Sequence, residues 1–140
     1  MIEACVRLMN SGIKLSTTII LGLGGTERWR EHAISTADVL NEINPDYLGA
    51  LTLMVVEGTE LHREIEEGKF QVPDSGMILR EMHLLVKNLD LCDCIFRSNH
   101  ASNYLPIGGI LSKDKDRILK VIDIAIKNEV FLRPESYRAL

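Results

Sequence analysis

The sequence predicts an α/β fold built from three β-α units around a mainly parallel sheet. Three apolar, strand-like segments lie at residues 15–23, 47–56 and 92–98, and each is followed by a polar or glycine-containing loop and then by a helical pattern. The centres of these segments are about 30 and about 44 residues apart, close to what a β-α-β crossover requires. With 140 residues, of which 46% are hydrophobic and 26% charged, the chain fits a single domain at residues 1–140.

The chain begins with a predicted helix and a predicted strand. Residues 1–11 place apolar side chains at helical spacing, and Gly12 supplies a stop. Residues 15–23 form the first strand. The nearly continuous apolar run from Ile19 is typical of a strand that is covered on both faces, as in parallel sheets.

The first strand leads into a long helix and then into the second strand. Thr26 is predicted to cap this helix, and Glu27 favours its first turn. Residues 44–46, Asn-Pro-Asp, end the helix, and residues 47–56 form the second strand. The buried stripe of the helix is predicted to consist of Trp29, Ala33, Ala37 and Leu40.

Two helices and the third strand follow. A short helix at about residues 60–67 stops at Gly68, and residues 73–75 start a longer helix. Residues 92–98 form the third strand, and a loop runs through residues 108–109. The apolar face of the longer helix is predicted to consist of Ile78, Met82, Leu85, Val86 and Leu89.

The chain ends with a predicted helix and a tail. Either Ser112 or Asp114 is predicted to cap the helix. Residues 131–140 form the tail. The inward side chains of the helix are predicted to be Ile118, Val121, Ile122, Ala125 and Ile126.

Net charge, hydropathy and cysteine content indicate which kinds of partner and which cellular compartment to expect. The net charge is −4 and the sequence has no stripe of Lys and Arg, so we expect no nucleic-acid partner. The longest apolar stretch, residues 19–23, falls far short of the roughly 20 residues of a membrane span, and no charged leader precedes an apolar segment. Three cysteines do not suggest a disulfide framework, so we expect a cytoplasmic protein.

A sheet of three parallel strands has two open edges, and open edges favour pairing with other strands. The segment therefore either belongs to a larger barrel or closes its edges by forming a homo-oligomer.

Residues 22–25, Gly-Leu-Gly-Gly, join the first strand to the next helix. They are not a dinucleotide fingerprint, because the third glycine of G-x-G-x-x-G would fall at Glu27, and no Gly-Lys-Ser/Thr follows to make a P-loop. One interpretation is a tight β-α turn in which glycine supplies positive φ. The other is a backbone wall for a cofactor at the carboxyl end of a strand, where barrel enzymes place their chemistry.

Residues 97–104, Arg-Ser-Asn-His-Ala-Ser-Asn-Tyr, follow the third strand directly. Such a density of hydrogen-bonding side chains suits the binding of a polar or carboxylate-bearing substrate, with Arg97 as the fixed positive charge. A solvated loop with local Asn and Ser turns explains the same residues.

Other polar positions favour structural interpretations. Cys92 and Cys94 would face the same side of a strand, and two thiols are too few for a closed zinc or cluster site, so we expect buried core residues. Residues 57–60 could reach a ligand at the end of the second strand, but a helix cap at Thr59 explains them equally well.

The four histidines match no established catalytic or metal-binding spacing. His32 and His83 lie on predicted helices beside charged residues, and we expect them to be solvated. Only His100 lies in a predicted functional loop.

The glycine segment resembles part of the radical S-adenosylmethionine enzymes. Residues 18–27 are similar to the adenine-contact segment of that family, whose loose pattern is Gly-x-Ile-x-Gly-x-x-Glu. Ile20 and Gly22 match this pattern. Thr18 replaces the first glycine, and the glutamate comes two residues late, at Glu27.

Two further segments are similar to later parts of the same barrels. Residues 48–61 look like the next strand, which commonly ends in a turn such as the Glu-Gly-Thr at residues 57–59. Residues 96–105 are similar to a downstream segment of the subgroup often labelled Fe-S oxidoreductases. The resemblance spans residues 2–138 and implies that the chain is the C-terminal segment of a TIM-like, partial barrel.

The resemblance also implies cofactors and contacts. Enzymes of this family use S-adenosylmethionine and a [4Fe-4S] cluster to generate a 5′-deoxyadenosyl radical, which takes a hydrogen atom from a small-molecule substrate. The implied adenine-side contacts come from Ile20, Leu21, Gly22, Gly24 and Gly25. The implied substrate-side contacts come from Arg97, Ser98, Asn99 and His100.

The cluster ligands of the family are missing from this sequence. The family binds its cluster with Cys-x-x-x-Cys-x-x-Cys on an early loop, a spacing that Cys5, Cys92 and Cys94 cannot supply. The Gly-Gly-Glu segment that grips the cofactor's amino group is absent too. The resemblance therefore implies a chain without the cluster-binding N-terminal half, and we expect no metal ligand, no catalytic residue and no turnover from residues 1–140 alone.

Two other functions stay open. The chain could be a non-enzymatic α/β module that binds a partner or pairs with itself through its sheet edges. It could also be a small-ligand binder that uses residues 22–25 to hold a phosphate.

Overall fold

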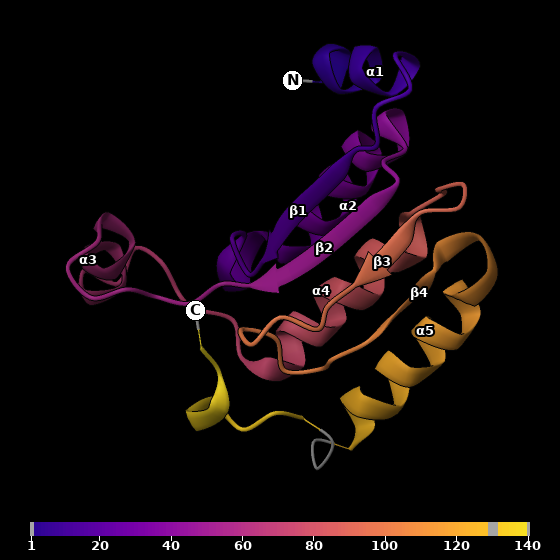
Figure 1. Cartoon of the computed structure of the whole chain (residues 1–140). Helices are drawn as coiled ribbons and strands as arrows, with labels where there is room; N and C mark the ends of the chain where they lie inside the picture. Colours follow the sequence, from indigo (N-terminus) through magenta and orange to yellow (C-terminus); the bar gives the residue numbers. More distant parts are fainter. Residues whose placement is uncertain (1, 129–131, 140) are drawn as a thin grey trace.

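A four-stranded sheet with helices packed on one of its faces forms the body of the chain (Figure 1). The structure is a computed structural model that describes residues 2–128 and 132–139. Its elements, in chain order, are α1 (Ile2–Asn10), β1 (Ser16–Leu21), α2 (Gly25–Ile43), β2 (Tyr47–Thr52), α3 (Glu60–Glu66), α4 (Ser75–Asn88), β3 (Ile95–Arg97), β4 (Gly108–Ile110), α5 (Leu111–Lys127) and the 3-10 helix η2 (Glu135–Tyr137).

The strand order is β1-β2-β3-β4, with the first three strands parallel and β4 antiparallel to β3. The expected α/β class with a mainly parallel sheet is therefore confirmed. Leu21 pairs with Thr52, and Gly49 pairs with Arg97. All three parallel strands thus point to the same edge of the sheet, which we call the carboxyl edge.

Strand β4 departs from the sequence prediction, which places a loop at residues 108–109. A Cβ on Gly108 would lie 2.9 Å from the backbone oxygen of Phe96, so this close pairing depends on glycine. Glycine is also depleted in strands generally, which hides the strand from propensity arguments. Strands β3 and β4 therefore form an antiparallel pair before helix α5.

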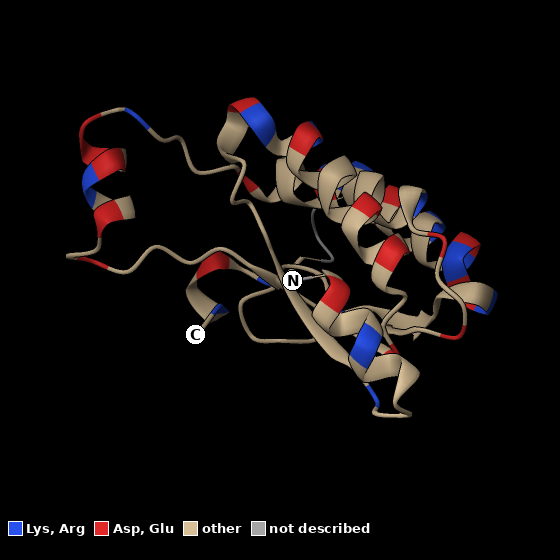
Figure 2. Ribbon diagram, turned by 90° about the horizontal axis from the view of Figure 1, so that it is seen from above, with Lys and Arg blue, Asp and Glu red and all other residues tan. Residues whose placement is uncertain are grey.

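Helices α2, α4 and α5 all lie on one face of the sheet, as two perpendicular views show (Figures 1 and 2). The predicted apolar stripes of α2 and α4 are buried in full, and that of α5 is buried or half-buried. The largest fully buried side chains between the helices and the sheet are Phe96, Leu21, Leu40, Leu48, Ile78, Leu79, Met82, Leu85, Leu89, Ile118 and Ile122.

The opposite face of the sheet is open. Along β1, Ser16, Thr18 and Ile20 are exposed, whereas Thr17 and Ile19 are half-buried on the helix side. Ile20 keeps 39% of its surface exposed. The prediction of a strand covered on both faces is therefore wrong, because the described helices that pack on the sheet cover a single face.

The strands are shorter than predicted. Strand β1 ends at Leu21 because Gly22 has a φ of +95° and turns the chain. Strand β2 ends at Thr52 rather than at residue 56. Strand β3 starts only at Ile95, after a left-handed residue at Asp93 with a φ of +53°.

Helix α2 begins earlier than predicted, and Thr26 is not its cap. Gly24 takes the N-cap position without a side-chain hydrogen bond. Thr26 lies in the first turn, where its backbone N–H donates to the Gln71 backbone oxygen and its hydroxyl donates to Gln71 Oε1, both at 3.1 Å. Thr26 therefore ties α2 to the segment before α4.

Helix α5 also begins earlier than predicted, at Leu111. Ser112 and Asp114 therefore lie inside the helix, although Asp114 Oδ2 still accepts the N–H of Ile110 at 2.9 Å. This hydrogen bond from the Ile110 backbone, followed by one from the Arg117 side chain, lowers the pKa of the Asp114 carboxyl. Asp114 thus satisfies a free donor of the helix end from four residues away.

Three predicted segments lie at the periphery. Helix α1 forms as predicted but buries none of its residues, and α3 projects away from the sheet (Figure 1). The Thr59 hydroxyl accepts the N–H of His62, which confirms the helix-cap interpretation of residues 57–60. The predicted tail is described from residue 132 to residue 139, and its two end residues lie outside the described part.

Residues of both charges alternate along the described helices. Figure 2 shows Lys and Arg interspersed with Asp and Glu along the helices. None of the helices in the described part of the chain combines the length and the apolar composition that a bilayer crossing requires.

Candidate functional site

Two of the sequence-predicted segments meet the carboxyl edge on either side of β2. The glycine turn, residues 22–25, follows β1, and the polar loop, residues 98–107, follows β3. The register of the parallel strands brings both to the same edge, as expected. Strand β2 and its continuation at residues 53–56 lie between them.

The glycine turn depends on its glycines for packing. Gly22 and Gly25 have φ values of +95° and +59°. A Cβ on Gly22 would lie 3.0 Å from Ile78 Cδ1, and a Cβ on Gly24 would lie 2.8 Å from the carbonyl group of Arg28. The tight-turn interpretation therefore accounts for these residues.

Two of the four backbone amides of the glycine turn, those of Gly22 and Gly25, donate hydrogen bonds inside the protein. The Gly22 N–H donates to Glu81 Oε2 at 2.9 Å, and the Gly25 N–H donates to the Gly22 oxygen at 3.1 Å. The Thr26 N–H donates to the Gln71 oxygen. A phosphate at the Gly22, Gly25 or Thr26 amide would have to displace these bonds, so the geometry disfavours phosphate binding at these three amides.

A buried carboxylate holds this turn in place. Glu81, on α4, has no exposed surface, and its Oε1 lies 2.6 Å from His32 Nδ1 while its Oε2 accepts the Gly22 N–H. Because a carboxylate accepts hydrogen bonds, the proton of the neutral His32 ring is on Nδ1 and Nε2 carries the lone pair. Only 25% of the His32 side chain is exposed, so the expectation of a solvated His32 is wrong.

Glu81 was missed at the sequence level, although a signal for it exists. It lies on the apolar face of α4, next to Met82 in the sequence and one helical turn from Ile78 and from Leu85. A carboxylate in such a stripe is costly unless it is paired, so its position alone indicates a buried partner. The partner itself could not be inferred, because Gly22 is 59 residues away in the sequence.

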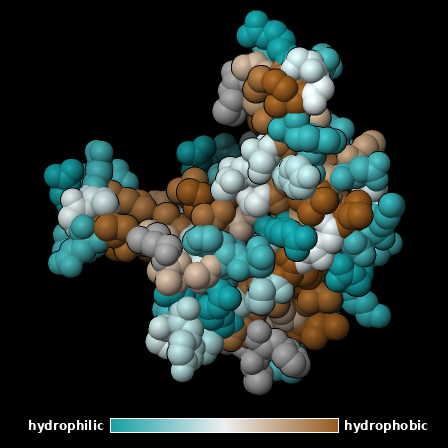
Figure 3. Space-filling view, in the orientation of Figure 1, coloured by the Kyte–Doolittle hydropathy of each residue, from teal (hydrophilic) through white to brown (hydrophobic). Residues whose placement is uncertain are grey.

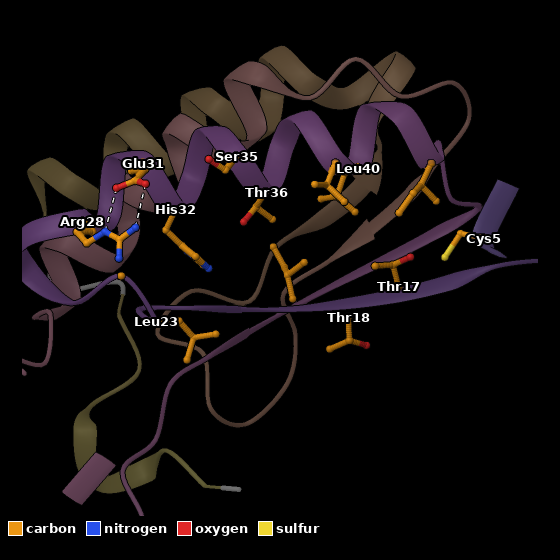
Figure 4. A pocket seen from close by; sticks show the side chains of 14 residues that line it. Cys5, Thr17, Thr18, Leu23, Arg28, Glu31, His32, Ser35, Thr36 and Leu40 are labelled. Atoms are coloured by element: carbon orange, nitrogen blue, oxygen red, sulfur yellow. Dashed lines mark hydrogen bonds and ion pairs between the residues drawn. The ribbon is translucent and has the colours of Figure 1, made fainter. Parts of the chain in front are cut away.

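A groove of about 540 Å³ runs between β1 and α2 at the β1 edge of the sheet (Figure 4). Its wall is mostly apolar, with Ile19 and Leu40 among its residues, and Cys5 of α1 lies at one end. His32 and Leu23 project into it (Figure 4). The groove therefore follows the edge strand of the sheet and reaches the glycine turn at the carboxyl edge, where Leu23 and Gly24 line it.

Among the predicted adenine-side residues, Ile20 is the side chain that a ligand could reach on the open face. It pairs with Leu51 of β2, and both project to the open face. Leu21 is fully buried toward the helices, so only its backbone could contact a ligand. The surface between the sheet and α3 is largely apolar in the space-filling view of this face (Figure 3).

The predicted substrate-side residues divide into two groups. Arg97, Asn99 and His100 are exposed at the carboxyl edge. Ser98 is fully buried: its hydroxyl donates to the Leu105 oxygen at 2.8 Å and accepts the Ile107 N–H at 3.2 Å. Ser98 therefore closes the polar loop, and its side chain does not reach a ligand.

Two residues of the polar loop that were not predicted as site residues complete the sheet. Strand β3 ends beside Gly49, so the backbone groups of Ala50 and Thr52 that point away from β1 have no strand partner in the described part of the chain. Asn103 Nδ2 donates to the Ala50 oxygen at 2.8 Å, and the Ser102 hydroxyl accepts the Thr52 N–H at 3.2 Å. These side chains substitute for a longer β3, which explains part of the polar density that the sequence shows.

The polar loop also fixes the proton of His100. The Ser102 N–H donates to His100 Nδ1 at 3.2 Å, and the Ser102 hydroxyl lies 3.0 Å from the same nitrogen. Since Nδ1 accepts, the neutral ring carries its proton on Nε2. In their neutral forms, His100 thus presents an Nε2–H donor to the solvent, whereas His32 presents an Nε2 acceptor to the groove.

The cysteines do not form a metal site. Cys92 is exposed and Cys94 is buried, so they do not share a face, because Asp93 has left-handed backbone and residues 92–94 precede β3. Burial raises the pKa of the Cys94 thiol to about 11. Within residues 2–128 and 132–139, no group of three His, Cys, Asp or Glu side chains is placed to hold a metal ion.

Comparison of the chain with protein-family models and with curated proteins finds no match.

Proposed function

We propose that this chain supplies the adenine-side and substrate-side contacts of a radical S-adenosylmethionine Fe-S oxidoreductase. The observation that carries the proposal is the arrangement of the open face. Ile20 belongs to the row of β1 and β2 side chains nearest the carboxyl edge, and Arg97 belongs to the adjacent row on the same face. An apolar contact and a fixed cation therefore face one space at the end of the strands where barrel enzymes bind ligands.

A TIM-like partial barrel is consistent with the sheet. The described helices that pack on it cover one face only, and the inner face of a barrel carries no helices. The Tyr47 N–H donates to the Leu15 oxygen and the Leu53 N–H donates to the Leu21 oxygen, so alternate β1 residues bond to β2. The backbone groups of the residues between them, at 16, 18 and 20, point outward and would accept a preceding parallel strand.

The adenine side fits the residues that are present. An exposed Ile20 beside Leu51 is an apolar surface on which a flat base can pack, and the adjacent turn brings bare backbone close. When bound, S-adenosylmethionine supplies the precursor of the radical that abstracts hydrogen. The chain's own contribution is to hold the adenine end and to shape the open face.

The [4Fe-4S] cluster does not fit the residues that are present. Its three thiolate ligands would have to come from Cys5, Cys92 and Cys94, which lie on α1 and before β3 and are exposed to different extents. The cluster would therefore be held by another part of the barrel. We expect no cleavage of S-adenosylmethionine by this chain alone after reconstitution with iron and sulfide.

The substrate side is supported by three exposed groups. Arg97 offers a bidentate cation, Asn99 an amide and His100 an Nε2–H donor, a set that suits a carboxylate-bearing small molecule. Ser98 is removed from this set, because its hydroxyl is used within the loop.

A methyl NMR titration tests the proposal. S-adenosylmethionine is added to the chain labelled at its Ile and Leu methyl groups, with GTP as the comparison ligand. We expect the Ile20 and Leu51 methyl signals to shift with S-adenosylmethionine and not with GTP, because these side chains pack on the adenine.

The matched control uses two exposed isoleucines, Ile20 and Ile34, which are 39% and 43% exposed. Ile34 lies on α2, away from the open face. Ile20→Ala is expected to weaken the binding of S-adenosylmethionine about tenfold, the loss that follows from removing roughly 1.4 kcal/mol of apolar contact, whereas Ile34→Ala leaves it unchanged. Equal affinities for the two variants, or shifts confined to the groove beside β1, would refute the adenine assignment.

A self-associating module is the second candidate, and the unpaired β1 edge favours it. Two copies could pair their β1 strands and cover both grooves. Sedimentation at several protein concentrations distinguishes the two: a dimer that dissociates when a proline replaces Thr18 supports the module, and a strict monomer opposes it.

A further inference from the structure

The described C-terminal residues, 132–139, cross the carboxyl edge and contact the polar loop. We call this segment the C-terminal strap. It contains the short helix η2, and Figure 1 shows it beside the ends of the strands. Two arginines, Arg133 and Arg138, make most of its hydrogen bonds with the loop. Glu135 accepts the Tyr104 hydroxyl, and the Ala139 N–H donates to the Ala101 oxygen.

Arg138 is the more deeply inserted of the two. Only 4% of its side chain is exposed. Its Nε donates to the Ser102 oxygen at 2.7 Å, and its Nη2 donates to the Leu53 oxygen at 3.0 Å, so one guanidinium joins the polar loop to the continuation of β2. It also lies over the ring of Tyr104, 4.1 Å from the centroid.

Arg133 takes the remaining carbonyl groups of the loop. Its Nη1 lies within 2.9 Å of the backbone oxygens of His100, Ala101 and Asn103, so its two N–H groups are shared among three acceptors. The backbone N–H of Arg133 donates to the Tyr104 oxygen at 2.7 Å. With the Arg138 contact, five consecutive carbonyl oxygens, at residues 100–104, receive hydrogen bonds from the strap.

This arrangement is unusual for a surface loop, whose carbonyl groups normally bond to water. The loop has few backbone hydrogen bonds of its own: the Asn103 N–H donates to the His100 oxygen, and the Ser98 N–H donates to the Ile107 oxygen. Its conformation therefore depends on donors from a segment about 30 residues away in the chain.

We propose that the C-terminal strap sets the conformation of the polar loop, with Arg138 and Arg133 as positioning residues that act through the carbonyl groups of residues 100–104. The strap thereby orients Asn99 and His100 toward the open face. A positive charge at position 138 is not enough to hold the loop. The planar guanidinium of Arg138 bonds to the Ser102 and Leu53 oxygens at the same time, which a lysine ammonium cannot do.

Amide hydrogen exchange in the full chain tests the proposal without any ligand. The reporters are the Ser102 and Asn103 amides in the loop, with Leu48 in β2 as the internal reference. We expect Arg138→Ala to speed exchange at the two loop amides by about tenfold or more, and the double variant with Arg133→Ala by about a hundredfold, while Leu48 changes less than about threefold.

Two further variants show whether a change in loop exchange is specific to the guanidinium of Arg138. Arg28→Ala is the matched control. Arg28 pairs with Glu31 as Arg138 pairs with Glu135, but it is 72% exposed and makes no hydrogen bond to the polar loop. It is expected to leave the loop amides unchanged. Arg138→Lys is expected to behave like Arg138→Ala.

The His100 ring signal is the second readout, because its Nδ1 bonds report the loop conformation directly. We expect it to move toward the position of a free histidine in Arg138→Ala, while the His32 signal stays. Loop amides that do not respond, a Leu48 amide that accelerates as much as they do, or full rescue by Arg138→Lys would each overturn the proposal.

The strap acts on the loop to which the proposed function gives substrate contacts, but no ligand enters the experiment. A chain that fails to bind S-adenosylmethionine would leave the strap assignment standing. Unchanged loop exchange would likewise leave the adenine assignment standing.

Discussion

The glycine turn and the polar loop lie at the same edge of the sheet but are held in different ways. The turn, residues 22–25, is fixed by backbone conformation and by one buried acceptor, Glu81. The loop, residues 98–107, is fixed by donors from the C-terminal strap and by its own buried side chains. The adenine side of the proposed site is thus part of the core, whereas the substrate side is assembled on the surface.

This difference indicates which half of the proposed site can accept substitutions without disturbing the core. Substitutions in the turn disturb packing against α4 and are felt by the whole domain. Substitutions in the exposed part of the loop disturb no core contact. If the proposed function is correct, its adenine side is rigid and its substrate side is adjustable.

The largest expected effect comes from Glu81. Glu81→Ala leaves the Gly22 N–H and the His32 ring without their acceptor and opens a cavity, so we expect a loss of about 3–5 kcal/mol in the free energy of unfolding. Urea denaturation measures it. Glu66→Ala, at an exposed position on α3, is expected to stay within about 0.5 kcal/mol of the wild type. Similar losses for the two variants would show that the turn is not held by Glu81.

Gly22→Ala is expected to cause the next largest loss in the free energy of unfolding. Its Cβ would meet Ile78 and Leu53 at 3.0 and 3.2 Å in a left-handed backbone, so strain and overpacking together are expected to cost about 2–4 kcal/mol. Gly58 has a similar φ of +82° but no atom within 4 Å of its Cβ position. Gly58→Ala should therefore lose only about 1 kcal/mol, and thermal unfolding of both variants separates packing from backbone strain. Equal losses would contradict the packing argument.

Two asparagines of the polar loop sharpen the comparison within the loop itself. Asn103 is fully buried and bonds to the Ala50 oxygen and the Thr52 hydroxyl, so we expect Asn103→Ala to cost about 1–3 kcal/mol. Asn99 is exposed, and Asn99→Ala is expected to change stability by less than about 0.5 kcal/mol. Urea titrations of both variants are the measurement, and a larger loss at Asn99 would reverse the assignment of the two residues.

The smallest expected effect is on how the stability of the chain depends on pH, through Tyr104. Burial, followed by the hydrogen bond to Glu135, raises the pKa of the Tyr104 hydroxyl from 10.0 to about 12. The unfolded chain loses this proton first, so the contribution of Tyr104 to stability is present below pH 10 and is lost between about pH 10 and 12. Tyr104→Phe should show a shallower decline over that range in urea titrations at stepped pH. An unchanged slope would show that the phenol is not held by the strap.

The sequence was sufficient for the features that depend on local spacing. The apolar stripes of α2 and α4, the turn at residues 44–46 and the cap at Thr59 follow from periodicity and from local hydrogen bonding. The three parallel strands follow from the spacing of apolar runs. These features involve residues close together in the chain, which is why the prediction reached them.

The features that were missed depend on distant partners. Glu81 contacts residues 59 and 49 positions away, and Asn103 contacts a residue 53 positions away. Polar residues in the loop looked alike in the sequence, yet Ser98 and Asn103 are buried while Asn99 is exposed. The Ala50 oxygen of β2 distinguishes Asn103, and the Leu105 oxygen and the Ile107 N–H distinguish Ser98. These contacts exist only in the folded chain.

The most direct test of the account is amide exchange along β1 at two protein concentrations. The amides of Ile19 and Leu21 point toward β2, whereas those of Thr18 and Ile20 point to the free edge. A chain that is one part of a barrel is expected to show fast exchange at Thr18 and Ile20 and slow exchange at Ile19 and Leu21, independent of concentration. Protection of Thr18 and Ile20 that grows with concentration would contradict it, because the edge would then be closed by a second copy.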